Sequence, residues 1–163
     1  MIVRDVIDGD WPGVWRLVQQ VLAENDTYPW PPDLSEADAR SDWFAPPPVR
    51  TRVAVDDDGR VVGAAKRGPN RPGPGAHVGT ASFLVDQDSR GHGVGRRLVV
   101  DTLERLREDG FAAVQFNAVA ASNVHAVRLY EDLGFEIIGT VPEAFEHPTQ
   151  GRVGVHVMHR ALD

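Results

Sequence analysis

The sequence predicts one mixed α/β domain, with a central sheet of about seven strands flanked by about four helices. The chain has 163 residues, of which 42% are hydrophobic, and this is enough for one compact core. Segments with strand patterning alternate along it with segments of helical periodicity. The proline-rich stretches are too short to link separate domains. We therefore expect residues 1–163 to form a single domain.

The N-terminal half is expected to supply three strands and two helices. Its strands are residues 2–7, 51–55 and 61–65, and its helices are residues 11–22 and 35–44. Apolar residues recur at helical spacing from Trp11 and define the first helix. Ser35 is suited to cap the second helix, which the three prolines after Ala45 would stop. Asp58 and Gly59 join the later strands, because an Asp-Gly pair adopts the positive φ angles of a tight turn.

The C-terminal half is expected to supply four strands and two helices. Its strands are residues 77–85, 113–119, 135–141 and 152–160, and its helices are residues 94–110 and 123–133. The strands are rich in β-branched and aromatic residues. An apolar face from Val94 to Leu106 defines the third helix, which Gly110 is placed to end. Asn123 opens the fourth helix and Gly134 closes it.

Composition excludes several classes of function. The formal net charge is −7, which disfavours binding to nucleic acid. The chain has no cysteine, so disulfides, thiolate metal sites and a cysteine nucleophile are all excluded. Neither a secretion signal nor an apolar run of the roughly 20 residues that span a membrane is recognisable. We expect a cytoplasmic protein without nucleic-acid or membrane partners.

A glycine-rich turn opens the third helix and has the features of an anion site. The turn comprises Arg90, Gly91, His92, Gly93, Val94, Gly95 and Arg96. Its glycines let a ligand approach the backbone, while the amides and dipole of a helix N-terminus favour negative charge. The basic residues add positive charge to an otherwise acidic protein. A pyrophosphate group would suit the turn, and a plain turn before a helix is the alternative.

Two common phosphate-binding motifs do not fit this turn. A P-loop requires Lys and then Ser or Thr after its last glycine, whereas Gly95 is followed by Arg96 and Arg97. A dinucleotide fingerprint requires a third glycine where Arg96 stands. It also requires an acidic residue at the end of the next strand, where Asn117 occurs. Neither nucleotide-binding fold is therefore predicted.

Two segments carry a resemblance to a known family. Arg90, Gly93 and Gly95 match a cofactor signature that reads Gln or Arg, two residues, Gly, one residue, then Gly or Ala. Residues 123–135 resemble the later segment of the same family, in which an Asn opens a helix and a Tyr, here Tyr130, lies two turns along it. In this order the two segments resemble the GNAT acetyltransferase superfamily.

The resemblance implies a GNAT-type fold, acetyl-CoA as the acetyl donor, and no metal. The strand that ends with Phe83, Leu84 and Val85 would pair with the pantetheine arm. The amides of residues 90–96 would surround the pyrophosphate. Asn123 would also contact the cofactor, although a helix-opening Asn is by default an N-cap.

The resemblance also implies roles in catalysis and acceptor binding. Tyr130 would protonate the leaving thiolate, and the alternative is a core tyrosine. Glu24 and Tyr28 follow the first helix, where the family places its acceptor pocket, and a solvated loop is the alternative there. A narrower similarity to acetyltransferases of proline analogues such as azetidine carboxylate rests on residues 115–119 and adds Asn117 to the acceptor site. Thr80 departs from the Asn of those enzymes.

The predicted function is therefore transfer of an acetyl group to the amine of a small molecule, with amino acids and their analogues among the candidates. Transfer would be direct, in a ternary complex. A catalytically silent domain that binds acyl-CoA is the competing hypothesis. A homodimer is a further expectation, because GNAT proteins often dimerise. His156 and His159 are three apart on one strand and would face opposite sides, so we predict no metal site there.

Overall fold

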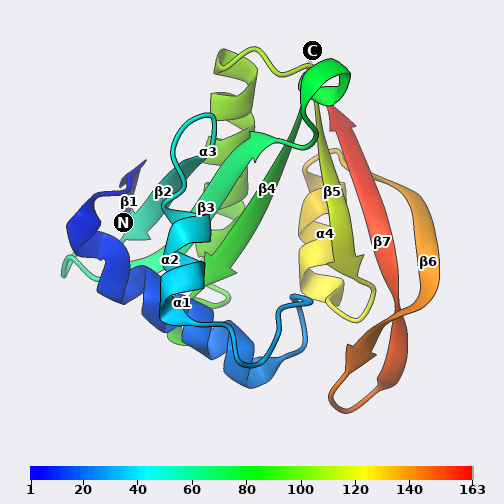
Figure 1. The fold of residues 1–163 in the computed structure, drawn as a ribbon, viewed down its shortest axis with the longest axis horizontal. Helices are drawn as coiled ribbons and strands as arrows, with labels where there is room; N and C mark the ends of the chain where they lie inside the picture. The colour runs from blue at the N-terminus through cyan, green and yellow to red at the C-terminus, as the bar shows by residue number, and fades with distance from the viewer. Residues whose placement is uncertain (163) are drawn as a thin grey trace.

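A mixed sheet of seven strands runs through the protein in a computed structural model that describes residues 1–162 (Figure 1). The strands are β1 (Ile2–Asp5), β2 (Arg50–Val55), β3 (Val61–Pro69), β4 (Val78–Val85), β5 (Ala113–Ala120), β6 (Glu136–His147) and β7 (Gly151–Ala161). Their order is β1-β2-β3-β4-β5-β7-β6, and only the β4–β5 pair of this sheet is parallel. The predicted fold class is confirmed.

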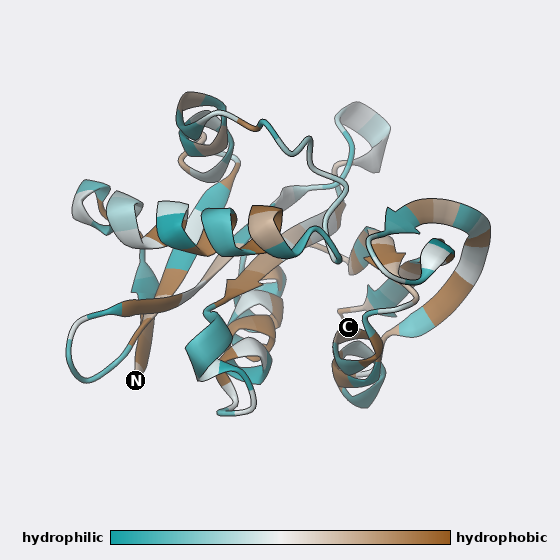
Figure 2. Cartoon of the chain, turned by 90° about the horizontal axis from the view of Figure 1, so that it is seen from below, coloured by the Kyte–Doolittle hydropathy of each residue, from teal (hydrophilic) through white to brown (hydrophobic). Residues whose placement is uncertain are grey.

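Helices cover both faces of the sheet (Figure 1). They are α1 (Trp11–Glu24), α2 (Glu36–Trp43), α3 (Val94–Glu108) and α4 (Val124–Asp132). The first two pack on one face, where Val14 and Trp43 share a core with Leu84 of β4. The other two pack on the opposite face, where Leu103 of α3 and Tyr130 of α4 share a core with Phe116 of β5. Figure 2 shows the hydrophobic residues concentrated along the central strands, between these layers.

The strands β4 and β5 are paired only at their beginnings. Val78 pairs with Ala113 and Gly79 with Val114, and no further pair is formed. Beyond these residues the two strands diverge and leave an opening in the sheet (Figure 1). The amide of Asp86 bonds to β3, and backbone groups alternate in direction along a strand. The N–H and C=O groups of Phe83 and Val85 therefore face the opening.

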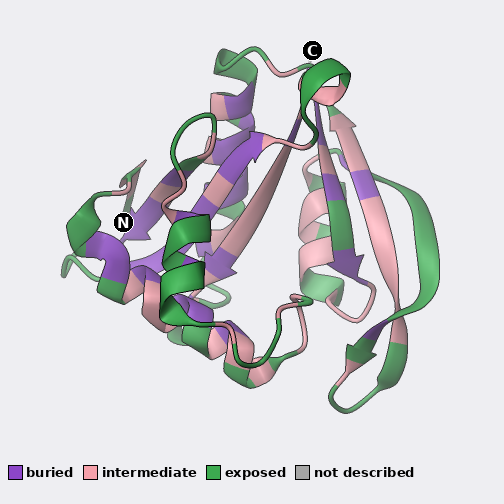
Figure 3. Ribbon diagram, viewed as in Figure 1, coloured by how far each residue is buried: buried purple, intermediate pink, exposed green. Residues whose placement is uncertain are grey.

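Several predicted boundaries differ from those observed. The first strand ends at Asp5, because the amide of Ile7 bonds instead to the Asp10 carboxylate at 2.8 Å. The strand expected at residues 135–141 continues to His147 as β6. Pro142 is tolerated there because β6 is an edge strand, and its pairing with β7 shifts register at that point. Figure 3 shows that β6 is exposed along most of its length.

The prediction that Asn117 ends its strand is wrong. The strand β5 continues to Ala120, and its pairing with β7 shifts register between Phe116 and Val119. Asn117 therefore lies in an irregular part of the strand, beside the opening, rather than in a loop after it.

The buried carboxylate of Asp86 joins α1 to the end of β4. Asp86 is fully buried and accepts hydrogen bonds from Arg16, from Gln20 at 2.9 Å and from Arg60 at 3.2 Å. Burial alone would raise the pKa of Asp86. The hydrogen bonds from Gln20 and Arg16 and the charges of Arg16 and Arg60 outweigh it, so the pKa lies below its usual value. Asp86 thus fixes the point from which the glycine-rich turn begins.

Replacing Asp86 by Asn keeps the shape of the side chain and removes its charge. We expect the free energy of unfolding to fall by about 2 kcal/mol at neutral pH, because Arg16 and Arg60 lose their partner but stay partly in water. Because the pKa of Asp86 is lower in the folded than in the unfolded state, its stabilisation is present above about pH 4. That stabilisation is lost as the pH falls through the folded pKa.

Urea denaturation at neutral pH and at about pH 3 measures this difference, which should shrink at the lower pH. Asp88→Asn is the matched control, because the Asp88 side chain is 84% exposed. It should change the free energy of unfolding by less than about 0.5 kcal/mol. Equal losses in the two variants would contradict the role assigned to Asp86.

Candidate active site

A cleft of about 1090 Å³ lies along the opening between β4 and β5. The lining includes the glycine-rich turn and the start of α4. It also includes the loop after α1, the helix α2 and His147 at the end of β6. All predicted site residues except His92 line this cleft: Glu24, Tyr28, Phe83, Leu84, Val85, Arg90, Gly91, Gly93, Val94, Gly95, Arg96, Asn117, Asn123 and Tyr130. His92 is exposed on the turn outside the lining.

The glycine-rich turn presents backbone rather than side chains to the cleft. Gly93 is the N-cap of α3 with a φ of 80°, and no side chain caps the amides of the first turn. Gly91 also has a positive φ, of 77°. A Cβ on Gly95 would lie 3.6 Å from Val85 and 3.8 Å from Leu129, where it would narrow the cleft. Uncapped amides at a helix N-terminus suit an anionic ligand.

Two arginines of the turn are already paired with carboxylates. Arg90 donates to both oxygens of Glu24 at 2.7 and 2.6 Å, and Arg96 donates to Asp132 at 2.7 Å. The hydrogen bond from Arg90 holds the pKa of Glu24 below its usual value, against the effect of burial. The positive charge predicted for the turn is therefore partly neutralised. The structure also places Glu24 beside the turn, bonded to Arg90, and not free in an acceptor pocket.

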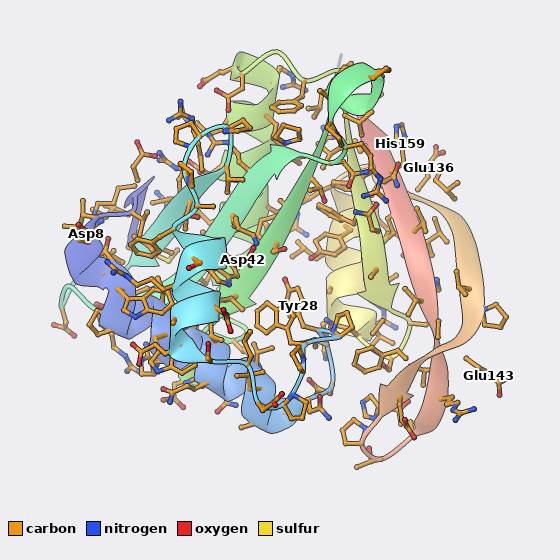
Figure 4. The ribbon with its side chains drawn as sticks, viewed as in Figure 1. Asp8, Tyr28, Asp42, Glu136, Glu143 and His159 are labelled. Atoms are coloured by element: carbon orange, nitrogen blue, oxygen red, sulfur yellow. The ribbon has the colours of Figure 1, made fainter. Side chains whose placement is uncertain are left out.

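Tyr28 occupies part of the free edge of β4. Its hydroxyl donates to the carbonyl of Phe83 at 2.9 Å and accepts from the Phe83 amide at 2.8 Å. Its ring stacks on Trp30 with centroids 4.5 Å apart. Burial raises the pKa of Tyr28 to about 12, although the hydrogen bonds to Phe83 and Ser82 act in the opposite direction. Figure 4 shows Tyr28 near the opening between β4 and α4.

Tyr130 stands in an aromatic cluster on α4. Its ring centroid lies 4.6 Å from that of Phe116, 5.8 Å from that of Phe135 and 6.3 Å from that of Phe83. Burial raises the pKa of its hydroxyl, and the nearby Tyr28 adds to the rise. In residues 1–162 we find no hydrogen-bond partner for this hydroxyl. It therefore remains protonated at neutral pH and is free to donate to a ligand.

The two predicted asparagines make different local contacts. The side chain of Asn123 accepts from the Ala126 amide at 3.3 Å and so caps α4. The side chain of Asn117 donates to Asn70 at 2.6 Å and accepts from Gln115 at 2.8 Å. Both residues line the cleft. The N-cap role of Asn123 is observed, whereas its contact with the cofactor stays a prediction.

Sequence reasoning missed several residues that the tertiary structure brings to the cleft. They include Asp42 from α2, Lys66 from β3, Ser82 from β4 and His147 from the β6–β7 hairpin. No local motif marks them. In residues 1–162 no group of three or more His, Asp or Glu side chains is arranged to hold a metal ion. None of the helices there has the length and apolar content needed to cross a membrane.

The model of the acetyltransferase (GNAT) family matches residues 15–135. The chain belongs to the GNAT acetyltransferase family. This assignment confirms the enzyme class that the glycine-rich turn and the Tyr130 segment predicted from sequence. Both strands that border the opening, β4 and β5, lie within the matched residues.

Three proteins are similar to this GNAT enzyme in sequence or in structure. The L-methionine sulfoximine/L-methionine sulfone acetyltransferase of Pseudomonas aeruginosa is 34% identical over 146 residues, covering 86% of this chain and 83% of that protein. A GCN5-related N-acetyltransferase from Kribbella flavida has a TM-score of 0.96 at 51% identity, covering 98% and 96% of the two chains. The yncA protein of Salmonella typhimurium, solved with acetyl-CoA, has a TM-score of 0.87 at 21% identity, covering 100% and 94%. At that identity the similarity shows a common fold and nothing further.

The two tyrosines of the chain should differ in their effect on stability. Tyr28→Phe removes the only hydroxyl bonded to Phe83 and leaves both backbone groups without that partner. We expect a loss of about 1 to 2 kcal/mol, or a fall of about 2 to 8 °C in Tm. Tyr130→Phe is the matched control, because its hydroxyl has no protein partner to lose. Thermal unfolding without ligands measures both, and a larger loss in Tyr130→Phe would contradict this account.

Proposed function

We propose that this GNAT enzyme transfers the acetyl group of acetyl-CoA to the amine of a small molecule, by direct transfer in a ternary complex. One observation carries the proposal: a single cleft joins uncapped helix amides, the free edge of β4 and the unpartnered hydroxyl of Tyr130. Acetyl-CoA would supply an activated thioester with an anionic pyrophosphate. These three features match its pyrophosphate, its pantetheine amides and its sulfur in turn.

The residues of the cleft fit the cofactor in this order. The amides of residues 91–96 would bind the pyrophosphate, and the dipole of α3 would stabilise its charge. The N–H and C=O groups of Val85 face the opening and would pair with the pantetheine arm. The backbone groups of Leu84 point toward β3, so Leu84 would not bond to the cofactor and would only help to place Phe83 and Val85. The missing Cβ of Gly95 keeps the path between Val85 and Leu129 open.

Tyr130 would act as general acid. A neutral amine attacks the thioester carbonyl, and an amide of β4 stabilises the negative charge that develops on its oxygen. The carbon–sulfur bond then breaks, and the hydroxyl of Tyr130 donates its proton to the leaving sulfur. The nitrogen releases its extra proton to solvent, and the tyrosinate regains a proton from solvent. Burial raises the pKa of Tyr130. The same apolar surroundings would also raise the pKa of the thiol, which limits the pKa difference against which the proton moves.

An amino acid or a close analogue is the proposed acceptor. The relative from Pseudomonas aeruginosa acts on methionine sulfoximine and methionine sulfone, and it aligns with most of this chain. The stacked rings of Tyr28 and Trp30 form an apolar wall in the part of the cleft lined by the loop after α1 and by α2, here called the acceptor end. Asn117 lines the same cleft and offers an amide. These features support a small acceptor that combines an amine with an apolar side chain.

The cofactor site is tested at Gly95 rather than at Gly93. Gly93 has a φ of 80°, so a side chain there would strain the backbone as well as fill the cleft. Gly95 lies in the helix with an ordinary conformation. Gly95→Val should weaken acetyl-CoA binding at least about tenfold in calorimetry, while Tm falls by only a few degrees. Gly93→Val would therefore test the cofactor site less specifically.

Gly139→Val is the matched control for Gly95→Val. Gly139 has an ordinary φ and open space around it, and it lies outside the cleft. This variant should bind acetyl-CoA as the wild type does. Unchanged affinity in a folded Gly95→Val protein would show that the cofactor does not lie along the turn.

Turnover by the Tyr130→Phe variant separates an enzyme from a silent acyl-CoA binder. A general acid should be worth about 10²-fold to 10⁴-fold in turnover, with the affinity for acetyl-CoA unchanged. Release of CoA thiol during a screen of amines measures the rate. Turnover within about threefold of wild type, where chemistry limits the rate, would exclude Tyr130 as the acid. Binding of acetyl-CoA without turnover on any amine would favour the silent binder.

A further inference from the structure

The chain has one lysine, Lys66, and the fold places it in the cleft. Lys66 lies on β3 directly opposite Ser82 of β4, so their side chains leave the sheet on the same face. This is the face of α1 and α2, because Ala64 and Leu84 at the same alternation belong to the core beneath those helices. Ser82 precedes Phe83, whose amide faces the opening. Lys66 is therefore one strand away from the proposed reacting centre.

The ammonium of Lys66 is held on two sides by α2. It forms an ion pair with the carboxylate of Asp42, and it lies 5.5 Å from the ring centroid of the buried Trp43. The lysine side chain is 19% exposed, whereas that of Asp42 is 57% exposed. The lysine is thus fixed beneath a carboxylate that faces solvent. Figure 4 shows Asp42 on α2, above Tyr28 in that view.

Lys66 differs in position from the arginines that line the cleft. In residues 1–162 the lysines and arginines that line the cleft are Lys66, Arg90 and Arg96. Arg90 and Arg96 belong to the glycine-rich turn and are paired with Glu24 and Asp132. Of these three residues, Lys66 alone lies outside the glycine-rich turn, on β3 beside α2. An anionic group of the acceptor that enters there would meet this ammonium.

We propose that Lys66 binds the carboxylate of an α-amino acid acceptor and so determines specificity for that class. The inference rests on the proposed transfer to a small amine and deepens it. In an α-amino acid the carboxylate is attached to the carbon that bears the amine. Lys66 can therefore hold the carboxylate on one side of β4 while the amine points to the opening beside Phe83. The rings of Tyr28 and Trp30 are then available to the amino-acid side chain.

Asp42 occupies the place of this carboxylate in the free protein. A carboxylate from the acceptor offers the ammonium the same kind of bond, and Asp42 can turn to solvent because it is more than half exposed. The exchange leaves no buried charge unpaired, so its electrostatic cost is small. Trp43 keeps the lysine in position while the exchange takes place.

The test compares acceptors that differ only in the carboxylate. The panel pairs the common L-amino acids with their amides, and adds L-methionine sulfone with its amide. Calorimetry in the presence of CoA measures binding, and thiol release measures kcat/KM. The wild type should prefer the acid over the amide by about tenfold to a hundredfold in at least one pair. Lys66→Met should reduce that preference to within about twofold, and Lys66→Arg should retain most of it.

Two controls isolate the lysine. Lys66→Met leaves Asp42 without its partner, and its charge could repel the acid. The double variant Asp42→Asn/Lys66→Met removes both charges, and the preference for the acid should be lost there as well. Arg50→Met removes an exposed cation of β2 outside the cleft and should change neither ratio. All variants should bind CoA as the wild type does, because Lys66 lies on β3, outside the proposed cofactor site at the glycine-rich turn and Val85.

The outcomes separate this inference from the function on which it rests. If no amine stimulates consumption of acetyl-CoA, the proposed transfer fails, and the binding measurements still test the lysine. If no acid in the panel binds more tightly than its amide, Lys66 does not bind the carboxylate of an acceptor, and the inference is wrong. A preference for the acid that survives in both Lys66→Met and the double variant would overturn the inference equally.

Discussion

The early separation of β4 from β5 is the constraint on which the rest of the molecule depends. Two parallel strands paired over their whole length would use their backbone groups on each other and close the sheet. Here only the first residues of β4 and β5 are paired, and the later groups of β4 face an opening. Unpaired backbone groups are costly unless something binds them. The site is built from this unsatisfied edge.

The elements around the opening act to hold it apart and to supply its chemistry. Packing of α3 and α4 in one core with Phe116 supports β5 from behind, while α1 supports β4 through Leu84. Asp86 ties the end of β4 to α1 through Arg16 and Gln20. The glycine-rich turn therefore starts from a rigid point. The cleft is open because two separate cores hold its two sides.

Tyr28 gives the free protein a partner for part of this edge. Its hydroxyl uses both backbone groups of Phe83, in the way a small polar ligand would. Tyr28 lies on the loop after α1, beside the stacked ring of Trp30. This loop is thus in direct contact with the edge of β4. A change at either one reaches the other through a single side chain.

The charges of the cleft are set by neighbouring side chains and not by the net charge of the protein. The protein carries a net charge of −7, yet the cations that line the cleft are each paired with a carboxylate in the free state. Such pairs keep the arginines and the lysine in place at little energetic gain, since most of the partners are partly exposed. Under the proposed function a ligand anion would replace one carboxylate with another, and the cations themselves would need little reorganisation.

The sequence by itself determined the elements and the family. Helical and strand periodicity fixed the number and order of elements, and the spacing of Arg90, Gly93 and Gly95 marked the turn, because these are local properties of the chain. Only the tertiary structure decided that Glu24 bonds to Arg90, that Tyr28 bonds to Phe83, and that Lys66 pairs with Asp42. Each of these contacts joins residues on different elements, some more than fifty positions apart. Such contacts depend on strand order, register and the packing of α1 and α2, which no local pattern encodes.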